Sequence, residues 1–358
     1  MQDVDTLMQQ AVSEKVFPGG VLLVSKERTV ALHKAYGMAD VVSPRRMSTD
    51  TLLDLASLTK PLATALAIMV LIKQKKLDLE QRLGAVLPAF VGDTKASIKV
   101  KHLLYHNSGL PSYRAYYKDV AHAPAQKRKN EVRKLLVKEP RIHPIGEHVE
   151  YSDLGFMILE WMIEYLSGAR LDQFVSEKVY GPLGIENLFF VDLYAPQTKG
   201  DFAATEHCPW RNKVLVGEVH DENAYVSGGI QGHAGLFGSA TAVHTLLLTL
   251  LSAYHLETSN PFFSTDLVRL FFRRLPNTDK ALGFDAPAVK NSSSGNFFSS
   301  NSVGHLGFTG TSFWLDLDRS VIVVLLTNRV HPNRDNDAIK SFRPKLHDAV
   351  MKKLLGIN

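Results

Sequence analysis

Ser57 and Lys60 form a Ser-x-x-Lys sequence that occurs once in the chain and directly precedes a long apolar run, Pro61 to Ile72. The run is rich in Ala and Leu, lacks Gly and is apolar on nearly all sides, which is typical of a helix buried in a protein. Pro61 suits the first turn of such a helix, where its missing N–H has no intrahelical partner anyway. A helix that starts near Ser57 puts the Ser57 hydroxyl and the Lys60 amine one turn apart on one face.

This placement suits nucleophilic catalysis. A serine hydroxyl is a weak nucleophile unless a base lies beside it. Lys60 can serve as that base if burial and nearby positive charge lower its pKa. Ser57 would also lie at a helix N-terminus, where unpaired N–H groups can stabilise an oxyanion. Because about one Ser-x-x-Lys is expected by chance in a chain of this length, the alternative is a serine N-cap followed by a lysine that extends into solvent.

Composition excludes several classes of protein. The chain has 358 residues, 45% of them hydrophobic and 22% charged, which is ample for a large core and unlike a disordered chain or a coiled coil. The net charge of +5 is scattered, and the short basic runs at 73–76 and 127–129 lack interleaved aromatic residues. We therefore expect no nucleic-acid partner. The length predicts two domains, or one domain with a large insertion.

Cys208 is the one cysteine, so no intramolecular disulfide can form, and its neighbour His207 is not part of a metal-ligand spacing. The first residues are acidic and lack the apolar core of a secretory signal, and no 18-residue apolar stretch predicts a membrane span. We expect a cytoplasmic location, or a periplasmic one if a leader has been removed.

The distribution of periodic segments predicts an α+β fold. A helix is expected over residues 4–16, a hairpin at 21–24 and 29–32, and two further strands at 311–317 and 320–327. Helical patterns occupy most of 97–200, then 240–253 and 335–355, whereas the polar segment 276–300 is expected to be a mobile surface loop. Because strands occur at both ends, we predict one antiparallel sheet built from both termini, flanked by helices. The expected domains are 1–90 with 215–358, and a mainly helical 91–214, with a cleft between them.

Two further motifs follow Ser57 in the chain: Tyr151-Ser152-Asp153 at the start of a helical run, and His305-Leu306-Gly307 near a strand. In this order and at these separations they resemble the Ser-x-x-Lys, Tyr-x-Asn and Lys/His-Thr-Gly motifs of the serine β-lactamase-like superfamily. Within this superfamily the motifs look most like those of the group of class C β-lactamases, DD-peptidases and family VIII carboxylesterases. Further similar stretches lie at 17–20, 55–61, 102–111, 182–184 and 327–329, so the resemblance covers most of the chain.

The resemblance implies roles for individual residues. Ser57 is the expected nucleophile, and Lys60 and Tyr151 manage protons. The backbone N–H groups of Ser57 and Phe308 are the expected oxyanion hole. Asp153, His305, Leu306, Gly307 and Phe308 are expected to contact substrate, and the glycine to allow close approach of a substrate backbone. No metal or cofactor is needed for this chemistry.

Two departures from the family motifs bear on the substrate. Asp153 replaces an asparagine, and an ionised carboxylate beside Lys60 would hold the amine protonated. Either Asp153 points away from Lys60, or Tyr151 takes more of the role of base. His305-Leu306 lacks the lysine and the threonine hydroxyl that contact a substrate carboxylate. Both departures favour esters or uncharged amides over β-lactams.

Three histidines, His106, His220 and His233, together with acidic residues near 218–222, are candidate metal ligands. Their spacing matches no His-x-x-x-His pattern, which favours ordinary hydrogen bonding in loops. The glycine-dense segment 217–237 is expected to border the cleft.

These observations predict a serine hydrolase that forms an acyl-enzyme on Ser57 and releases the acid of a small-molecule or peptide substrate, as a carboxylesterase does. One alternative is a DD-peptidase or a weak class C-type β-lactamase. Another is a catalytically silent, penicillin-binding-like sensor. Transfer of the acyl group to an acceptor other than water remains open, as does the oligomeric state.

Overall fold

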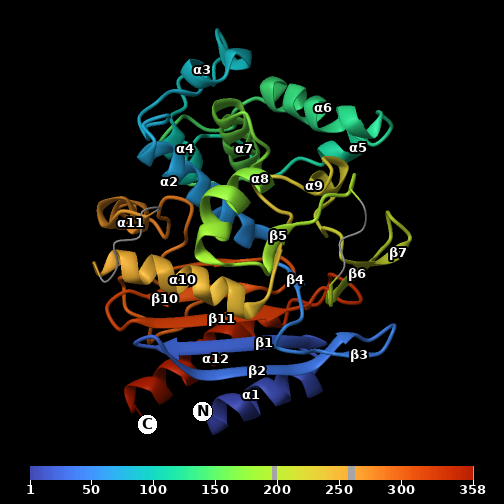
Figure 1. Ribbon diagram of the computed structural model, residues 1–358, viewed down its shortest axis with the longest axis vertical. Helices are drawn as coiled ribbons and strands as arrows, with labels where there is room; N and C mark the ends of the chain where they lie inside the picture. Colours follow the sequence, from blue (N-terminus) through green and yellow to red (C-terminus); the bar gives the residue numbers. More distant parts are fainter. Residues whose placement is uncertain (196–199, 257–262, 358) are drawn as a thin grey trace.

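The computed structural model describes residues 1–195, 200–256 and 263–357. Its largest sheet is antiparallel and has six strands in the order β3-β2-β1-β11-β10-β9, so strands from the two ends of the chain pair at its centre (Figure 1). This confirms the predicted α+β fold. The strands of this sheet are β1 (Gly19–Lys26), β2 (Thr29–Asp40), β3 (Arg45–Arg46), β9 (Ser302–Leu306), β10 (Ser312–Asp316) and β11 (Val321–Thr327).

Both faces of the sheet are covered. β1 pairs with β11 from Gly20 opposite Thr327 to Lys26 opposite Val321. Alternate residues of a strand point to opposite faces, and Leu22 and Val24 accordingly pack with α1 (Gln2–Ser13) and α12 (Ile339–Leu355). Val21 and Leu23 join the larger core on the other face. Because both faces are buried, these central strands are apolar throughout instead of alternating.

The helix that begins at the Ser-x-x-Lys sequence runs through the larger core. It starts as a 3-10 turn (Ala56–Leu58), continues as a π-helical segment (Lys60–Ala65) and ends as α2 (Leu66–Lys73). By length and composition, residues 56–73 would be apolar enough to cross a membrane, but 83% of this stretch is buried inside the protein. Among the described residues it is the one helix that passes this test, and its burial identifies it as a core helix.

The remaining helices lie mainly on the α2 side of the sheet (Figure 1). They confirm the predicted helical character of the middle of the chain and the predicted helix at 240–253. They are α3 (Leu83–Val86), a 3-10 turn (Pro88–Phe90), α4 (Val100–Leu104), α5 (Tyr116–Val120), α6 (Ala125–Lys138), α7 (Asp153–Ser167), α8 (Leu171–Val175), a π-helical segment (Ser176–Tyr180), a 3-10 turn (Gly181–Leu183), α9 (Glu222–Val226), α10 (Ala240–Tyr254) and α11 (Thr265–Phe272).

Two small sheets were not expected from the sequence. One consists of β4 (Leu53–Asp54), β8 (Leu236–Gly238) and β5 (Leu188–Phe190), and the other of β6 (Ala204–Cys208) and β7 (Lys213–Val216). β4 leads directly into the turn that carries Ser57, so its pairing with β8 anchors the start of that helix. The division into two domains stays a prediction.

The segment 276–300 corrects an expectation. It contains no regular element, but Phe284 and Phe298 are buried and Asp285 forms an isolated bridge with Gly304 of β9. Its low apolar content suggested a mobile surface loop. The few apolar residues that it has are instead spaced so that they pack against the sheet and α12.

Candidate active site

The turn before Ser57 is held in place by Asp54, the last residue of β4. Its carboxylate accepts hydrogen bonds from the N–H groups of Ala56 at 2.8 Å and His220 at 2.6 Å. Ala56 has a φ of 47°, in the left-handed region that residues with a Cβ atom rarely adopt. Such strain persists only where the surroundings enforce it, and it is common beside catalytic groups. The conformation turns the chain sharply from the strand into the helix and presents Ser57 at the corner.

Lys60 lies fully buried beneath Ser57. Its ammonium donates to Ser57 Oγ at 3.0 Å and to the backbone carbonyl of His233 at 3.1 Å, and lies 2.7 Å from Asp153 Oδ1. The alternative of a solvent-exposed lysine is therefore wrong. Asp153 also does not point away from Lys60, which removes one of the two explanations offered above for the departure from asparagine.

Asp153 controls the protonation of Lys60. Burial by itself would lower the pKa of the Lys60 ammonium, but the negative charge of Asp153 at 2.7 Å, with a contribution from Tyr151, raises it above its ordinary value. The condition set for Lys60 to act as the base, a lowered pKa, is therefore not met, and Asp153 holds the amine protonated as its carboxylate predicts. At neutral pH Lys60 is therefore a cation and a hydrogen-bond donor to Ser57.

Tyr151 and Asp153 are positioned by the start of α7. Ser152 is the helix N-cap: its Oγ accepts from the N–H of Gly155 at 3.3 Å and donates to the carbonyl of Pro111 at 2.7 Å. The Ser152 N–H donates to His106 Nδ1 at 2.9 Å. The His106 ring stacks on Tyr151 with 4.6 Å between centroids, which fixes the plane of the phenol.

The environment of Tyr151 favours the neutral phenol. Burial raises the pKa of Tyr151, and the positive charge of Lys60, whose ammonium lies 4.8 Å from the ring centroid, offsets only part of that rise. A neutral phenol can both accept and donate a proton through the same oxygen. Tyr151 is therefore suited to relay a proton instead of storing a negative charge.

Two backbone N–H groups are free to bind an oxyanion. The Ala56 carbonyl accepts from Thr59 Oγ1 at 2.6 Å, and the Gly307 carbonyl accepts from the Gly310 N–H at 3.1 Å. In a trans peptide the N–H points opposite to the carbonyl, so the N–H groups of Ser57 and Phe308 point the other way. Within the described ranges neither has a protein partner. Their assignment as the oxyanion hole stays a prediction that this geometry allows.

Ser57 opens into a cavity of about 320 Å³. Of the residues predicted to act in catalysis or binding, Ser57, Tyr151, Asp153 and Phe308 line it, whereas Lys60 lies beneath its floor. The expectation that the segment 217–237 borders the site is confirmed. The lining consists of Ala56, Ser57, Tyr113, Tyr151, Asp153, His220, Asp221, Glu222, His233, Ala234, Phe308 and Arg334.

His305, Leu306 and Gly307 do not line this cavity. His305 is 2% exposed, and burial lowers its pKa to about 4, so the ring is neutral at pH 7. A Cβ atom on Gly307 would lie 2.0 Å from Thr311 Oγ1 and 2.7 Å from the Leu55 carbonyl. A glycine is thus required where the chain that leaves β9 packs against Thr311 and the start of the Ser57 helix. Direct substrate contacts of these three residues stay untested predictions.

The buried His305 predicts a pH dependence of stability. The folded protein keeps this ring neutral down to about pH 4, whereas the unfolded chain protonates it near pH 6.5. The unfolded state therefore binds more protons between these values, and stability is lost as pH falls below 6.5. Between pH 7 and pH 5, the unfolding free energy of His305→Gln should therefore fall by about 2 kcal/mol less than that of wild type. Urea unfolding at both pH values measures it, and His122→Gln at an exposed position should leave the loss unchanged. Equal losses in wild type and His305→Gln would contradict the prediction.

Asp153, Asp221 and His233 each place a potential metal-ligand atom within 4.8 Å of the others. His233 Nε2 lies 2.9 Å from Asp221 Oδ1, and Asp153 contacts the Lys60 ammonium. A metal ion bound to all three would meet the positive charge of Lys60, so the contacts favour hydrogen bonding, as the sequence interpretation did.

Three further residues near the site escaped the sequence interpretation. Tyr113 and Arg334 line the cavity but belong to no recognisable motif. Lys280, from the segment expected to be a surface loop, lies 6.0 Å from the centroid of the Tyr151 ring and is paired with Asp285 at 2.6 Å. No local pattern could have found them, because each reaches the site from a loop distant in sequence.

Comparisons with known proteins agree with this geometry. Residues 4–344 match the family described as Beta-lactamase. The chain is 32% identical to the N-acetylmuramyl-L-alanine amidase of Bacillus subtilis (strain 168), over 92% of this chain and 81% of that protein. It is 30% identical to a putative D-alanyl-D-alanine carboxypeptidase of Escherichia coli (strain K12), over 90% and 82% of the two chains.

Among solved structures, that of EstCE1, a hydrolase with promiscuous acyltransferase activity, has the same fold, with a TM-score of 0.78 at 21% identity and 98% of both chains covered. The match to the family over nearly the whole chain, together with the arrangement of Ser57, Lys60 and Tyr151, leads to one conclusion. The chain belongs to the Beta-lactamase family and is a serine hydrolase.

Proposed function

We propose that this protein cleaves an amide or ester through an acyl-enzyme on Ser57. The observation that carries the proposal is the hydrogen bond of 3.0 Å from the buried Lys60 ammonium to Ser57 Oγ, at the edge of a cavity. Besides its contacts with Asp153 and the His233 carbonyl, the Lys60 ammonium orients one lone pair of Ser57 Oγ and leaves another lone pair free for attack.

The charges define the order of proton transfer. Ser57 Oγ forms a bond to the substrate carbonyl carbon while its proton passes to the Tyr151 oxygen, and the Tyr151 proton passes to the leaving amine or alcohol. The C–N or C–O bond then breaks. Water enters, and the same relay in reverse releases the acid. Lys60 stays protonated and stabilises negative charge that develops on Ser57 and Tyr151, and the N–H groups of Ser57 and Phe308 bind the oxyanion.

Amides are the better-supported substrates. The relatives at 30% and 32% identity are named for cleavage of amide or peptide bonds. A Tyr151 phenol with a raised pKa also retains its proton for an amine leaving group, which must be protonated to depart. Esters, which leave more easily, should be cleaved by the same site and serve as reporters.

Detection of the acyl-enzyme tests the proposal. On mixing with p-nitrophenyl esters of increasing acyl length and quenching in acid, we expect the intact mass to rise by one acyl group, on the peptide that contains Ser57. The label should be absent from Ser57→Ala. Nitrophenol release with no label on Ser57 in either protein would contradict the mechanism. If the protein shows no label and no turnover with either the esters or nitroanilides, that result would favour the sensor alternative.

A further inference from the structure

We infer that Arg334 recognises a neutral oxygen of the substrate, such as an amide carbonyl or a hydroxyl, and that Glu206 and Glu222 make this recognition selective against a carboxylate. The inference rests on the proposed function and concerns the same cavity. It assigns a specificity-determining role to three residues that lie outside the three motifs.

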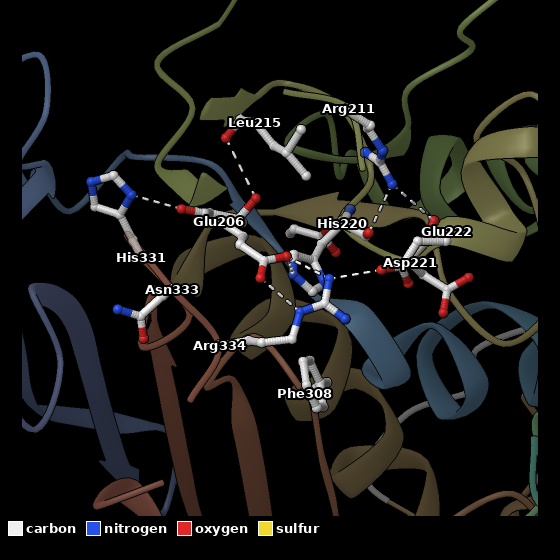
Figure 2. A network of polar contacts seen from close by, with 12 residues as sticks. Glu206, Arg211, Leu215, His220, Asp221, Glu222, Phe308, His331, Asn333 and Arg334 are labelled. Atoms are coloured by element: carbon white, nitrogen blue, oxygen red, sulfur yellow. Dashed lines mark hydrogen bonds and ion pairs between the residues drawn. The ribbon is translucent and has the colours of Figure 1, made fainter. Parts of the chain in front are cut away.

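Arg334 is held by two carboxylates. Its Nε donates to Glu206 Oε1 at 2.8 Å, and its Nη2 contacts both Glu206 Oε2 and Glu222 Oε1, the latter at 2.7 Å. Figure 2 shows the guanidinium between the two glutamates, with the Phe308 ring beneath it. The three residues come from distant parts of the chain: β6, the first turn of α9, and the loop between β11 and α12.

The residues that hold Arg334 also contact one another. Glu206 also contacts His220 Nε2 at 3.1 Å, and the His220 ring stacks on Phe308 with 5.6 Å between centroids. Phe308 is the predicted oxyanion residue, and its carbonyl accepts from Arg329 Nε at 2.8 Å. The arginine is thus linked through Phe308 to the position where the reacting carbonyl is expected.

One edge of the guanidinium is left for a ligand. A guanidinium carries five N–H donors. The glutamates use Nε and Nη2, and within the described ranges no protein atom accepts from Nη1. Arg334 lines the cavity and its side chain is 34% exposed, so Nη1 is open to a bound molecule.

The charge balance determines which molecule is favoured. Among the residues that line the cavity, Asp153, Asp221 and Glu222 carry negative charge against the one positive charge of Arg334, and Glu206 adds a further negative charge beside it. The cations close by are Lys60, which is paired with Asp153, and Arg329, 4.5 Å from the centroid of the Phe308 ring, so negative charge remains in excess. A substrate carboxylate would meet net repulsion here, whereas a neutral oxygen gains the Nη1 hydrogen bond without it. Because both glutamates already use Nε and Nη2 of Arg334, a substrate carboxylate cannot form the bidentate pair that makes arginine a strong carboxylate ligand.

Two pairs of esters test the inference. The first pair varies the acyl side: p-nitrophenyl esters of succinamic acid and of the monoanion of succinic acid. The second varies the leaving side: acetates of 4-hydroxybenzamide and 4-hydroxybenzoate. We expect wild type to prefer the carboxamide member by kcat/KM in at least one pair. Glu222→Gln should reduce that preference about 10-fold by removing one negative charge. Arg334→Gln should lower kcat/KM for the preferred carboxamide about 10-fold. Arg334→Lys should recover little of that kcat/KM, because an ammonium lacks the planar, forked arrangement of donors of a guanidinium.

Arg170 provides a matched control. It is also held by two carboxylates, Asp172 and Asp192, and is similarly exposed at 37%, but lies outside the cavity. Arg170→Gln and Asp192→Asn should change neither the rates nor the preference, and thermal unfolding of all variants shows that they are folded. An unchanged preference in Glu222→Gln for both pairs, or equal effects of the Arg334→Gln and Arg170→Gln variants, would overturn the inference.

Binding separates this inference from the proposed function. Titration calorimetry of the same esters with Ser57→Ala, with and without Glu222→Gln, measures recognition without turnover. If wild type cleaves none of the esters but Ser57→Ala still binds the carboxamide member more tightly and Glu222→Gln reduces that selectivity, the proposed function fails and the inference stands. If the esters are cleaved without charge selectivity, the inference alone fails.

Discussion

Ser57→Ala is expected to lower kcat/KM for an ester substrate by about 10⁴-fold or more, because no acyl-enzyme can form without the hydroxyl. The methyl group of alanine fits wherever the serine fits, and Lys60 keeps its contacts with Asp153 and the His233 carbonyl. The fold should therefore persist. The comparison is made by initial rates of nitrophenol release, together with thermal unfolding of both proteins.

The exposed Ser176 supplies the control for this change. Ser176→Ala should have wild-type activity. If Ser57→Ala retained more than about a hundredth of the wild-type rate at unchanged stability, another nucleophile would have to act, and the assignment of Ser57 would be wrong.

Lys60→Met is expected to reduce both activity and stability. Activity should fall about 10³-fold, since the cation that stabilises charge on Ser57 and Tyr151 is lost. The unfolding free energy should fall by about 3 kcal/mol, because the Asp153 carboxylate, 18% exposed, loses the ammonium that compensates it. Denaturant unfolding and ester hydrolysis measure the two effects separately.

The double variant Lys60→Met/Asp153→Asn distinguishes catalysis from stability. Removing both charges leaves no uncompensated group, so most of the stability should return. Activity should stay low, because the cation is still absent. Lys134→Met, which breaks an exposed ion pair with Glu131, should cost at most about 1 kcal/mol. Recovery of activity in the double variant would show that Lys60 serves only to neutralise Asp153.

Local patterns were sufficient for the elements that carry the motifs. The apolar run after Ser57 predicted a buried helix that begins at the serine, and β1, β10 and β11 were found because fully covered strands are continuous apolar runs. The order of the three motifs predicted the family and the proximity of Ser57, Lys60 and Tyr151. Each of these inferences depends on residues a few positions apart, or on motif order, and needs no knowledge of long-range register.

Asp153 shows what local sequence patterns cannot predict, namely the direction of a side chain and its effect on a neighbouring pKa. Its replacement of an asparagine was visible in the sequence, but the direction of its side chain was not. At the start of α7, where Ser152 is the N-cap and contacts His106, the carboxylate lies 2.7 Å from the Lys60 ammonium, and it raises the Lys60 pKa that burial alone would lower. A pKa depends on distances of a few ångström between residues far apart in the chain, which composition and spacing do not define.

Arg334 and His305 also show that membership of a motif does not decide whether a residue lines the cavity. His305 belongs to a motif, yet the pairing of β9 with β10 buries it away from the cavity. Arg334 belongs to no motif, yet the fold brings it beside Phe308 and between glutamates more than a hundred residues away in sequence. The sequence by itself thus determined the family and predicted the catalytic groups, because these groups lie on one helix and in two recognisable motifs. Only tertiary packing decided the charge around them, because charge balance is the sum of contacts from many separate loops.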